Sequence, residues 1–212
     1  CIRDRDKGKK ALKELAALGI EADLIQYDAA DLDAPQKVYD YILEKYNKLD
    51  ILVNNAGVLL TGNLFVANST TVSDKDIKET FQTNLFSVIS LTQSLLPLIK
   101  KSDAGRIVNV STILSSLTLH SAKDSPIVPA KEFAYNASKT ALNAFTIHLA
   151  LELKDTNIKV NSGHPGWVKT ELGGPNAPME VKDSYETSLY LATLDKDGPS
   201  GGLFHKEETL PW

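Results

Sequence analysis

The stretch LDILVNNAG at residues 49–57 joins a short apolar run to a polar turn that ends in glycine. A continuous apolar run of this length, bounded by a turn signal, is typical of a strand buried in a parallel sheet. The stretch therefore predicts a buried parallel strand over residues 49–53 that leads directly into a tight turn at residues 54–57.

Predicted helices and strands alternate on both sides of this stretch. A helix over residues 7–18, a strand over 21–28 and a helix over 34–46, capped by Asp33, come before it. After it come a long helix from its cap Ser73 toward residue 100, a strand at 105–111, a helix at 133–153, a strand at 158–162, a helix at 180–194 and a short strand at 201–204. Such alternation indicates an α/β fold with a parallel sheet covered on both faces. We expect a doubly wound, Rossmann-type, three-layer α/β/α domain that binds ligands at the carboxyl ends of its strands.

The composition is that of one ordinary globular domain over residues 1–212, with 42% hydrophobic and 24% charged residues. The net charge of -4 gives no basic footprint for nucleic acid or for an anionic membrane. No apolar run approaches the ~18 residues of a membrane span, and no signal peptide is recognised. Cys1 is the only cysteine, so no internal disulfide forms. We expect a cytoplasmic protein without a metal site.

The predicted helix over residues 133–153 carries Tyr135 and Lys139 four positions apart. Such positions lie on one helix face, about 5–6 Å apart, so the phenol and the ammonium reach one site. A phenol normally titrates at about 10, and a neighbouring cation favours its ionised form. The pair has the chemistry of a tyrosine general acid or base near neutral pH. Taken alone, it is equally typical of a partly solvated helix face.

Other polar groups fall where a doubly wound sheet places its ligand. The turn at residues 54–57 ends one strand, Ser111 and Thr112 end the next, and residues 165–170 (PGWVKT) follow a third. Asn84 lies inside the long helix, where asparagine lowers helix propensity and often has a hydrogen-bonding role. Ordinary packing or solvation would explain each group by itself. Together they predict a polar site at one edge of the sheet.

These motifs, in this order and at this spacing, resemble the short-chain dehydrogenase/reductase family, and more closely its NADPH-dependent carbonyl reductase branch. The Tyr-x-x-x-Lys pair is joined by NNAG at 54–57, GRIVNVS at 105–111 and PGWVKT at 165–170, and the likeness extends from Arg3 to residue 204. The family's glycine-rich phosphate turn has no counterpart here. We therefore interpret the chain as N-terminally truncated, lacking the first strand, the first helix and most of the second strand. We expect the full-length protein to be active and this chain alone to bind cofactor poorly.

The resemblance implies a catalytic group. Tyr135 would donate a proton to the substrate carbonyl oxygen in reduction and accept one in the reverse reaction, while Lys139 would lower the pKa of that phenol. Asn84 would hold a water in a proton relay to Lys139. In the family a serine hydrogen-bonds the substrate carbonyl. The matching position is Thr112, which keeps a hydroxyl donor, and Ser111 is the alternative.

The resemblance also implies an NADP(H) site, with NAD(H) as the alternative. Arg3 stands at the position that reads the 2′-phosphate, for which the guanidinium fork is suited, while Asp4 keeps NAD(H) open. Lys139 would hydrogen-bond the nicotinamide ribose. The other matching positions are Asp28 and Ala29 at the adenine, Asn55, Ala56 and Gly57 at the adenosine ribose and pyrophosphate, Tyr135, and Pro165, Val168 and Thr170 at the nicotinamide.

The leading hypothesis is a reductase of small aldehydes or ketones, or a dehydrogenase of the matching alcohols. A sensor or scaffold that binds NADP(H) without turnover is the alternative, and Thr112 is the one feature that favours it. An apolar pocket drawn from residues 113–133, Trp167 and residues 171–181 favours a hydrophobic or aromatic carbonyl compound. The 22 residues between Thr112 and Tyr135 resemble the insertion of monomeric carbonyl reductases, which favours a monomer over a homo-oligomer.

Overall fold

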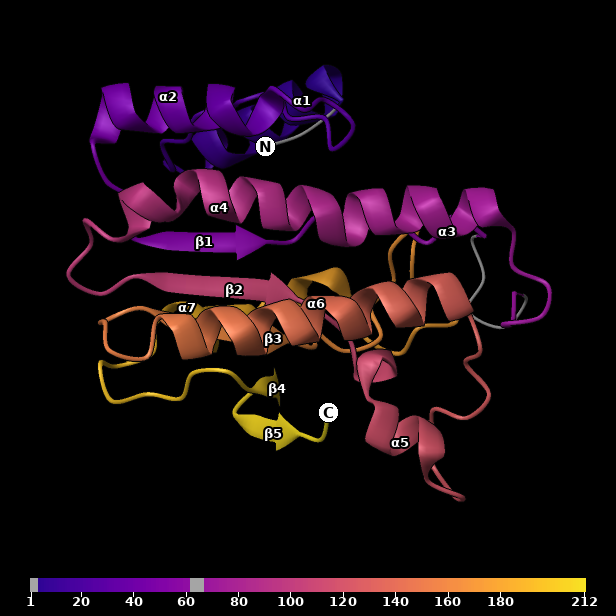
Figure 1. Cartoon of the computed structure of the whole chain (residues 1–212). Helices are drawn as coiled ribbons and strands as arrows, with labels where there is room; N and C mark the ends of the chain where they lie inside the picture. Colours follow the sequence, from indigo (N-terminus) through magenta and orange to yellow (C-terminus); the bar gives the residue numbers. More distant parts are fainter. Residues whose placement is uncertain (1–3, 62–66) are drawn as a thin grey trace.

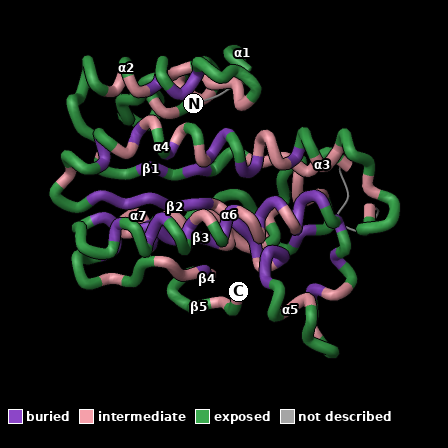
Figure 2. Tube along the Cα trace, in the orientation of Figure 1, coloured by how far each residue is buried: buried purple, intermediate pink, exposed green. Residues whose placement is uncertain are grey.

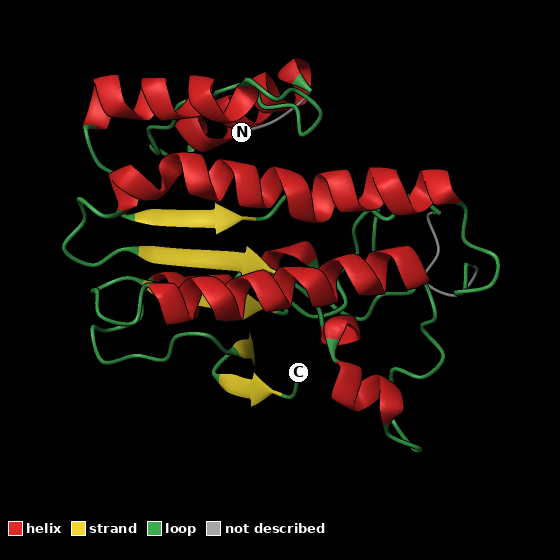
Figure 3. Ribbon diagram, viewed as in Figure 1, coloured by secondary structure: helices red, strands yellow, loops and turns green. Residues whose placement is uncertain are grey.

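The computed structural model describes residues 4–61 and 67–212 and builds them around one five-stranded sheet. The strands lie in the order β1-β2-β3-β4-β5, the first four parallel and the last antiparallel to its neighbour (Figures 1 and 3). Their bounds are β1 Ile51–Asn54, β2 Arg106–Val110, β3 Lys159–Gly163, β4 Leu203–His205 and β5 Glu208–Leu210. Parallel neighbours need crossover connections, and helices supply them.

Helices cover both faces of the sheet. In Figure 1, α6 lies in front of the strands and α7 behind them, while α2 packs against α4. The helices are α1 Arg5–Ala17, α2 Ala34–Tyr46, α3 Asp74–Phe81, η1 Gln82–Phe86, α4 Ser87–Ile99, η2 Ile113–Ser115, α5 Leu117–Ser121, α6 Phe133–Glu152, η3 Val181–Asp183 and α7 Glu186–Ala192. None of the helices described is both long and apolar enough to cross a membrane. This arrangement confirms the predicted doubly wound α/β fold.

The main hydrophobic core lies between the sheet and the layer of α4 and α6. Leu95, Leu98 and Ile99 of α4 pack with Ile107 of β2 and Val160 of β3, and none is more than 1% exposed. Figure 2 shows buried trace along much of β2, and β3 is buried from Val160 to Gly163. Burying one such side chain contributes roughly 1.5–3 kcal/mol. The core therefore holds these strands and helices in a fixed relation.

α6 matches its predicted range to within one residue, and its start has a specific cause. The Glu132 carboxylate accepts a hydrogen bond from the Tyr135 backbone N–H (2.9 Å), which satisfies a free donor of the first turn. α2 has its predicted range and Asp33 is its N-cap residue as predicted, but the Asp33 side chain makes no capping hydrogen bond. Asp33 has helical rather than extended backbone angles, and its N–H donates to the Asp31 carboxylate (2.9 Å).

The long helix predicted after Ser73 is interrupted in its middle. Ser73 caps α3 as predicted, accepting a hydrogen bond from the Asp76 N–H (3.0 Å). α3 and α4 are joined by η1, a π-helical turn with the fully buried Asn84 at its centre. Pro97 lies within α4, which ends two residues later. π-helical turns are rare and are frequently found at functional sites.

The prediction of a strand over residues 21–28 was wrong, since only Gln26 has bridge geometry there. A strand is stabilised by the ladder that it forms with a neighbour. In the described part of the chain β1 pairs with β2 alone, so no strand lies beside this segment. Ile25 and Tyr27 still pack against the main core, and the Tyr27 hydroxyl donates to the Ser87 carbonyl (3.1 Å). These side-chain contacts help to hold the segment against the core.

β1 is buried on one face only. Leu52 and Asn54 are buried, whereas Ile51 and Val53 are 43% and 40% exposed. The predicted parallel strand is therefore confirmed, while its predicted burial holds for one face only. The helix predicted over residues 180–194 is also shorter, being divided into η3 and α7, and β5 was not predicted.

Candidate active site

A cavity of about 930 Å³ lies at the carboxyl ends of β1, β2 and β3, where a doubly wound fold binds its ligands. Its walls come from the turns after these strands, from the first turns of α6 and from the segment that precedes α7. The predicted site residues that line it are Asn55, Gly57, Ser111, Thr112, Tyr135, Lys139, Pro165, Val168 and Thr170. The structure thus brings most of the predicted site together.

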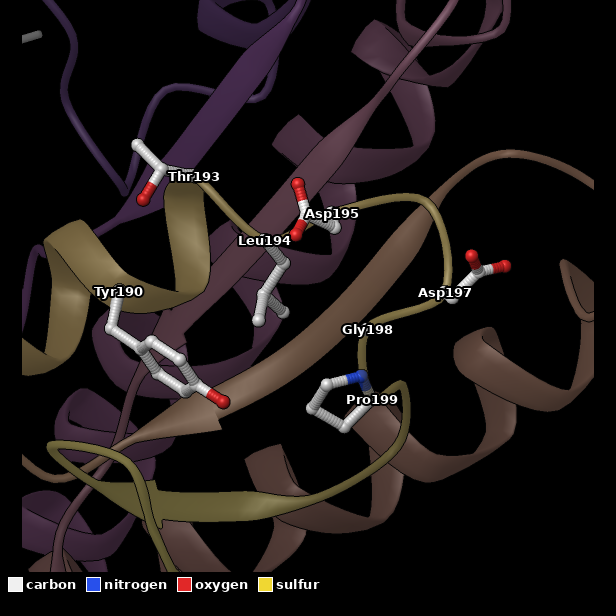
Figure 4. Close-up of a pocket in the computed structure, with 7 residues that line it drawn as sticks. All are labelled: Tyr190, Thr193, Leu194, Asp195, Asp197, Gly198 and Pro199. Atoms are coloured by element: carbon white, nitrogen blue, oxygen red, sulfur yellow. The ribbon is translucent and has the colours of Figure 1, made fainter.

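A second hollow, of about 410 Å³, lies at the other end of the sheet. It is formed by the end of α7 and the loop that follows, with Tyr190 and Pro199 on either side of Leu194 (Figure 4). The Leu194 carbonyl accepts a hydrogen bond from the guanidinium of Arg106 (Nε, 2.9 Å), the first residue of β2. The hollow therefore lies at the amino end of the strands, away from the expected ligand site.

Tyr135 and Lys139 lie in the first two turns of α6 and line the larger cavity, with 7% and 3% of their surface exposed. The Lys139 ammonium donates a hydrogen bond to the Val110 carbonyl at the end of β2 (2.8 Å). It also lies against Gly57, where an added Cβ would be 3.3 Å from the ammonium nitrogen. Glycine at this position lets the turn after β1 approach the ammonium closely.

Burial dominates the proton affinities of this pair. It raises the pKa of Tyr135 to about 12 and lowers the pKa of Lys139 to about 8, because each charged form loses hydration. The shift of Tyr135 is thus opposite to the predicted lowering by Lys139, since desolvation prevails. At pH 7 the phenol keeps its proton and the amine is about nine-tenths protonated. This is the state that a proton donor to a carbonyl oxygen requires.

The hydroxyls that follow β2 have different surroundings. The Ser111 hydroxyl donates to the Asn143 side-chain oxygen (2.8 Å) and is 2% exposed. The Thr112 hydroxyl oxygen accepts the Leu114 N–H (3.2 Å), which caps η2, and as the acceptor in that bond it keeps its own hydrogen as a donor. This geometry favours Thr112 over Ser111 as the group that meets a substrate.

Asn84 lies behind the cavity wall and organises the turn after β1. Its Oδ1 accepts the Val58 N–H (2.8 Å), and its Nδ2 donates to the Val58 carbonyl (3.0 Å) and to Ser138 Oγ (3.1 Å). A Cβ on Gly57 would lie 3.6 Å from the same Oδ1 and 3.3 Å from the Lys139 ammonium nitrogen, so both groups are neighbours of this glycine. The structure therefore places Asn84 beside Lys139, and its role in a water relay stays a prediction.

The segment after β3 forms another wall. Gly166 has a φ of 99°, in the left-handed region, and an added Cβ would lie 2.7 Å from the Met179 methyl carbon. Val168 forms a β-bridge with Met179, and the Trp167 Nε1–H donates to the Gly173 carbonyl (2.7 Å). These contacts fold the segment back on itself and hold Val168 at the cavity.

Among the described residues, three predicted cofactor positions do not line the cavity. The predicted Arg3 lies outside the described residues. The Asp28 carboxylate accepts a hydrogen bond from the Ala30 N–H, and the Ala29 carbonyl accepts one from the Gln82 side-chain amide (2.9 Å). Neither Asp28 nor Ala29 lines the cavity. Ala56 is exposed and also lies off the wall.

Three residues of this region were missed by the sequence analysis. Glu132 is 2% exposed and caps α6 directly before Tyr135. His164 lines the cavity, and burial, aided by His205, lowers its pKa to about 4. Asn143 bonds Ser111 from the next turn of α6. A signal existed for Asn143, because it continues the four-residue spacing of Tyr135 and Lys139.

Comparison with known proteins identifies the family. Residues 1–180 match the family model described as short chain dehydrogenase. The chain belongs to this family. This short-chain dehydrogenase is 29% identical over 250 residues to carbonyl reductase (NADPH) 1 of Mus musculus, an alignment that covers 99% of this chain and 87% of that protein. It is 30% identical over 247 residues to carbonyl reductase (NADPH) 1 of Homo sapiens, with the same coverage.

A solved structure supports the same assignment. The carbonyl reductase Sniffer of D. melanogaster superposes with a TM-score of 0.81 at 30% identity, covering 99% of this chain and 86% of that one. Its agreement extends across the sheet and the helices that frame the cavity. The short-chain dehydrogenase described here is therefore an oxidoreductase of this family.

Proposed function

We propose that this short-chain dehydrogenase is an NADPH-dependent reductase of aldehydes or ketones in which Tyr135 protonates the carbonyl oxygen. The observation that carries the proposal is a buried, protonated phenol next to a lysine on α6, in the wall of the cavity at the sheet's carboxyl end. Carbonyl reduction needs a proton donor within reach of the oxygen that gains negative charge. The reverse reaction, alcohol oxidation, uses the same group as a base.

The chain's own residues perform the proton chemistry. The hydroxyls of Tyr135 and Thr112 donate hydrogen bonds to the substrate carbonyl oxygen and stabilise the charge that develops there. As that charge grows, Tyr135 transfers its proton. The Lys139 ammonium then stabilises the tyrosinate, in surroundings where burial strengthens their attraction. Asn84 shapes the turn beside Lys139 and holds the water that relays a proton to it.

The cofactor fits features of this chain. The missing side chain of Gly57 leaves room beside the Lys139 ammonium, which offers donors to ribose hydroxyls. Pro165 and Val168 orient the nicotinamide from the segment after β3. When bound, the nicotinamide supplies the hydride that reduces the carbonyl carbon. The names of the curated relatives specify NADPH, and we assign the preference for its 2′-phosphate to Arg3.

The cavity wall favours a neutral, hydrophobic substrate. Within the described chain, Lys139 is the only lining residue with a formally charged side chain. The apolar lining residues include Ile113, Leu114, Pro126, Ile127, Trp167 and Leu172. A substrate carboxylate would lose its hydration here without a second cation to meet it. We therefore assign the substrate to carbonyl compounds with an apolar or aromatic body.

We also propose that the protein is a monomer, because the connection from Thr112 to Tyr135 has the length of the insertion in monomeric carbonyl reductases. It contains η2 and α5, and the α5 residue Thr118 donates its N–H to the Trp212 carbonyl (2.8 Å). Light scattering should give the mass of one chain. The mass of a dimer or a tetramer would contradict the proposal.

The function is tested on the full-length protein by following NADPH oxidation against a panel of neutral aldehydes and ketones, with NADH in parallel. Tyr135→Phe removes one hydroxyl and is expected to lower kcat by about 10²-fold or more while NADPH still binds. Tyr190→Phe, in the second hollow, is the matched control and should leave kcat unchanged. Equal activity of Tyr135→Phe and the natural protein would refute the mechanism. NADPH binding without turnover of any compound would instead favour a sensor or scaffold.

A further inference from the structure

A buried asparagine, Asn143, links α6, which carries Tyr135 and Lys139, to the segment after β2 that carries Thr112. Asn143 lies four residues after Lys139 and is 3% exposed. Its Oδ1 accepts a hydrogen bond from the Ser111 hydroxyl (2.8 Å), and its Nδ2 donates to the Ser115 hydroxyl (2.7 Å). The amide therefore joins α6 to both ends of the segment that carries Thr112.

The directions of these hydrogen bonds are fixed by the donors each group has. The Ser115 hydroxyl donates its single hydrogen to the Thr112 carbonyl, so it can only accept from Asn143. The Asn143 side-chain nitrogen must then face Ser115, which leaves its oxygen for Ser111. A directed chain results, running from Ser111 through the amide and Ser115 to the Thr112 backbone. Each of these side chains is buried, so water does not offer a substitute partner.

The chain of bonds bears on catalysis because Thr112 and Tyr135 come from different elements. Thr112 lies between β2 and η2, whereas Tyr135 lies on α6. Their separation depends on how the η2 segment is held against α6. The Asn143 amide supplies one link, and the Thr140 hydroxyl supplies a second by donating to the Ser115 carbonyl (2.9 Å).

We propose that Asn143 is a positioning residue that sets the Thr112 hydroxyl against Tyr135 for carbonyl binding. This inference rests on the proposed function, in which both hydroxyls contact the substrate oxygen. An apolar side chain at 143 would remove the acceptor of the buried Ser111 hydroxyl and the donor to the buried Ser115 hydroxyl, and would leave Ser111 only its longer contact with Ser115 Oγ (3.3 Å). The Ser115 side chain would then lose the bond that sets its orientation, and the Ser115 backbone N–H (3.1 Å) would be the one fixed donor left to the Thr112 carbonyl. A displacement of about 1 Å at a reacting group can cost on the order of 10²-fold in rate.

The test is a double-mutant cycle on the natural protein with NADPH and a carbonyl substrate that it reduces. Asn143→Ala is expected to lower kcat by about 10- to 100-fold and to leave the Kd of NADPH within about twofold. Thr112→Val removes the hydroxyl that Asn143 is proposed to position. In the Thr112→Val background, Asn143→Ala should cause little further loss, since there is no hydroxyl left to misplace.

Asn161→Ala is the matched control. Asn161 is also a buried asparagine with two hydrogen bonds, to the Pro199 carbonyl (2.8 Å) and from the Gly202 N–H (3.0 Å), but it lies in β3 away from this chain of bonds. Asn161→Ala should lower the melting temperature. Any fold-change that it causes in kcat should be independent of Thr112, so in the double mutant the two fold-changes should multiply. If Asn143→Ala does not fold, Ser115→Ala breaks the same chain and enters the same cycle.

The outcomes separate the inference from the function on which it rests. If the fold-losses in kcat of Asn143→Ala and Thr112→Val multiply fully in the double mutant, the positioning role is overturned while the reductase proposal stands. If Thr112→Val alone leaves kcat unchanged, Asn143 has no hydroxyl to act through and the inference also fails. If Tyr135→Phe remains as active as the natural protein, the proposed function itself fails, and this inference fails with it.

Discussion

Replacing Lys139 with methionine is expected to stabilise the protein while abolishing its activity. The ammonium is almost fully buried, and burial lowers its pKa from 10.5 to about 8. The difference between these values corresponds to about 3 kcal/mol of cost to the protonated native state at neutral pH. Methionine has a similar length without the charge, and loss of the charge-assisted bond to the Val110 carbonyl costs at least about 1.5 kcal/mol. The net gain in the free energy of unfolding at pH 7 is therefore at most about 1.5 kcal/mol.

The difference in unfolding free energy between Lys139→Met and the natural protein should depend on pH, and the Lys139 pKa determines the direction of that dependence. Between pH 8 and 10.5 the unfolded chain binds a proton at Lys139 that the native protein does not, so the natural protein gains stability as pH rises through this window. From pH 7 to 9.5 the gain amounts to about 2 kcal/mol, and Lys139→Met lacks it. The advantage of the variant should shrink accordingly. The raised pKa of Tyr135 affects stability only at higher pH: its contribution is lost as pH rises from 10, where the phenol of the unfolded chain titrates, to the native pKa of about 12.

Urea unfolding at pH 7 and pH 9.5, followed by tryptophan fluorescence, measures both effects. Lys123→Met changes an exposed lysine in the same way and is expected to leave the free energy of unfolding unchanged at either pH. A difference between Lys139→Met and the natural protein that does not depend on pH would refute the reasoning. So would a variant that is less stable at both pH values.

Three further outcomes are expected. Gly166→Ala forces a side chain into left-handed backbone against Met179 and should cost about 1–3 kcal/mol of unfolding free energy, measured by urea titration. Stability should fall as pH drops from 6.5 toward 4, by up to about 2–3 kcal/mol, because the unfolded chain protonates His164 before the native protein does; thermal melts of His164→Asn should lack this loss. Thr112→Ser should keep kcat within about tenfold, whereas Thr112→Val should lose about 10²-fold, and equal rates would argue against a hydroxyl role.

The sequence predicted the parts of the fold that local patterns determine. α2 has its predicted extent, and α6 matches its own to within one residue, because the apolar spacing that specifies a helix lies within the helix's own residues. The strand over residues 21–28 failed because a strand depends on a partner, which local sequence does not supply. The exposure of Ile51 in β1 likewise depends on what neighbours the strand, and not on its own apolar run.

The candidate site was predictable to the extent that it follows strand ends and helix spacing. Tyr135, Lys139 and Thr112 meet at one cavity because the topology brings these elements to one edge of the sheet. The direction of the Tyr135 pKa shift was missed because it depends on burial, which sequence spacing does not contain. The engagement of Ser111 by Asn143 was missed for a similar reason, since it depends on how α6 packs against the end of β2.

The π-helical turn at Gln82–Phe86 holds one residue more than an α-helical turn, because its backbone hydrogen bonds join residues five apart instead of four. The wider turn accommodates that residue, and α3 and α4 continue in line on either side of it (Figure 1). Asn84 lies in this wider turn, where its side chain bonds the Val58 backbone and Ser138. Deleting one residue from the turn would therefore restore regular α-helical bonding along the whole helix while removing the local backbone geometry that holds Asn84 in these bonds.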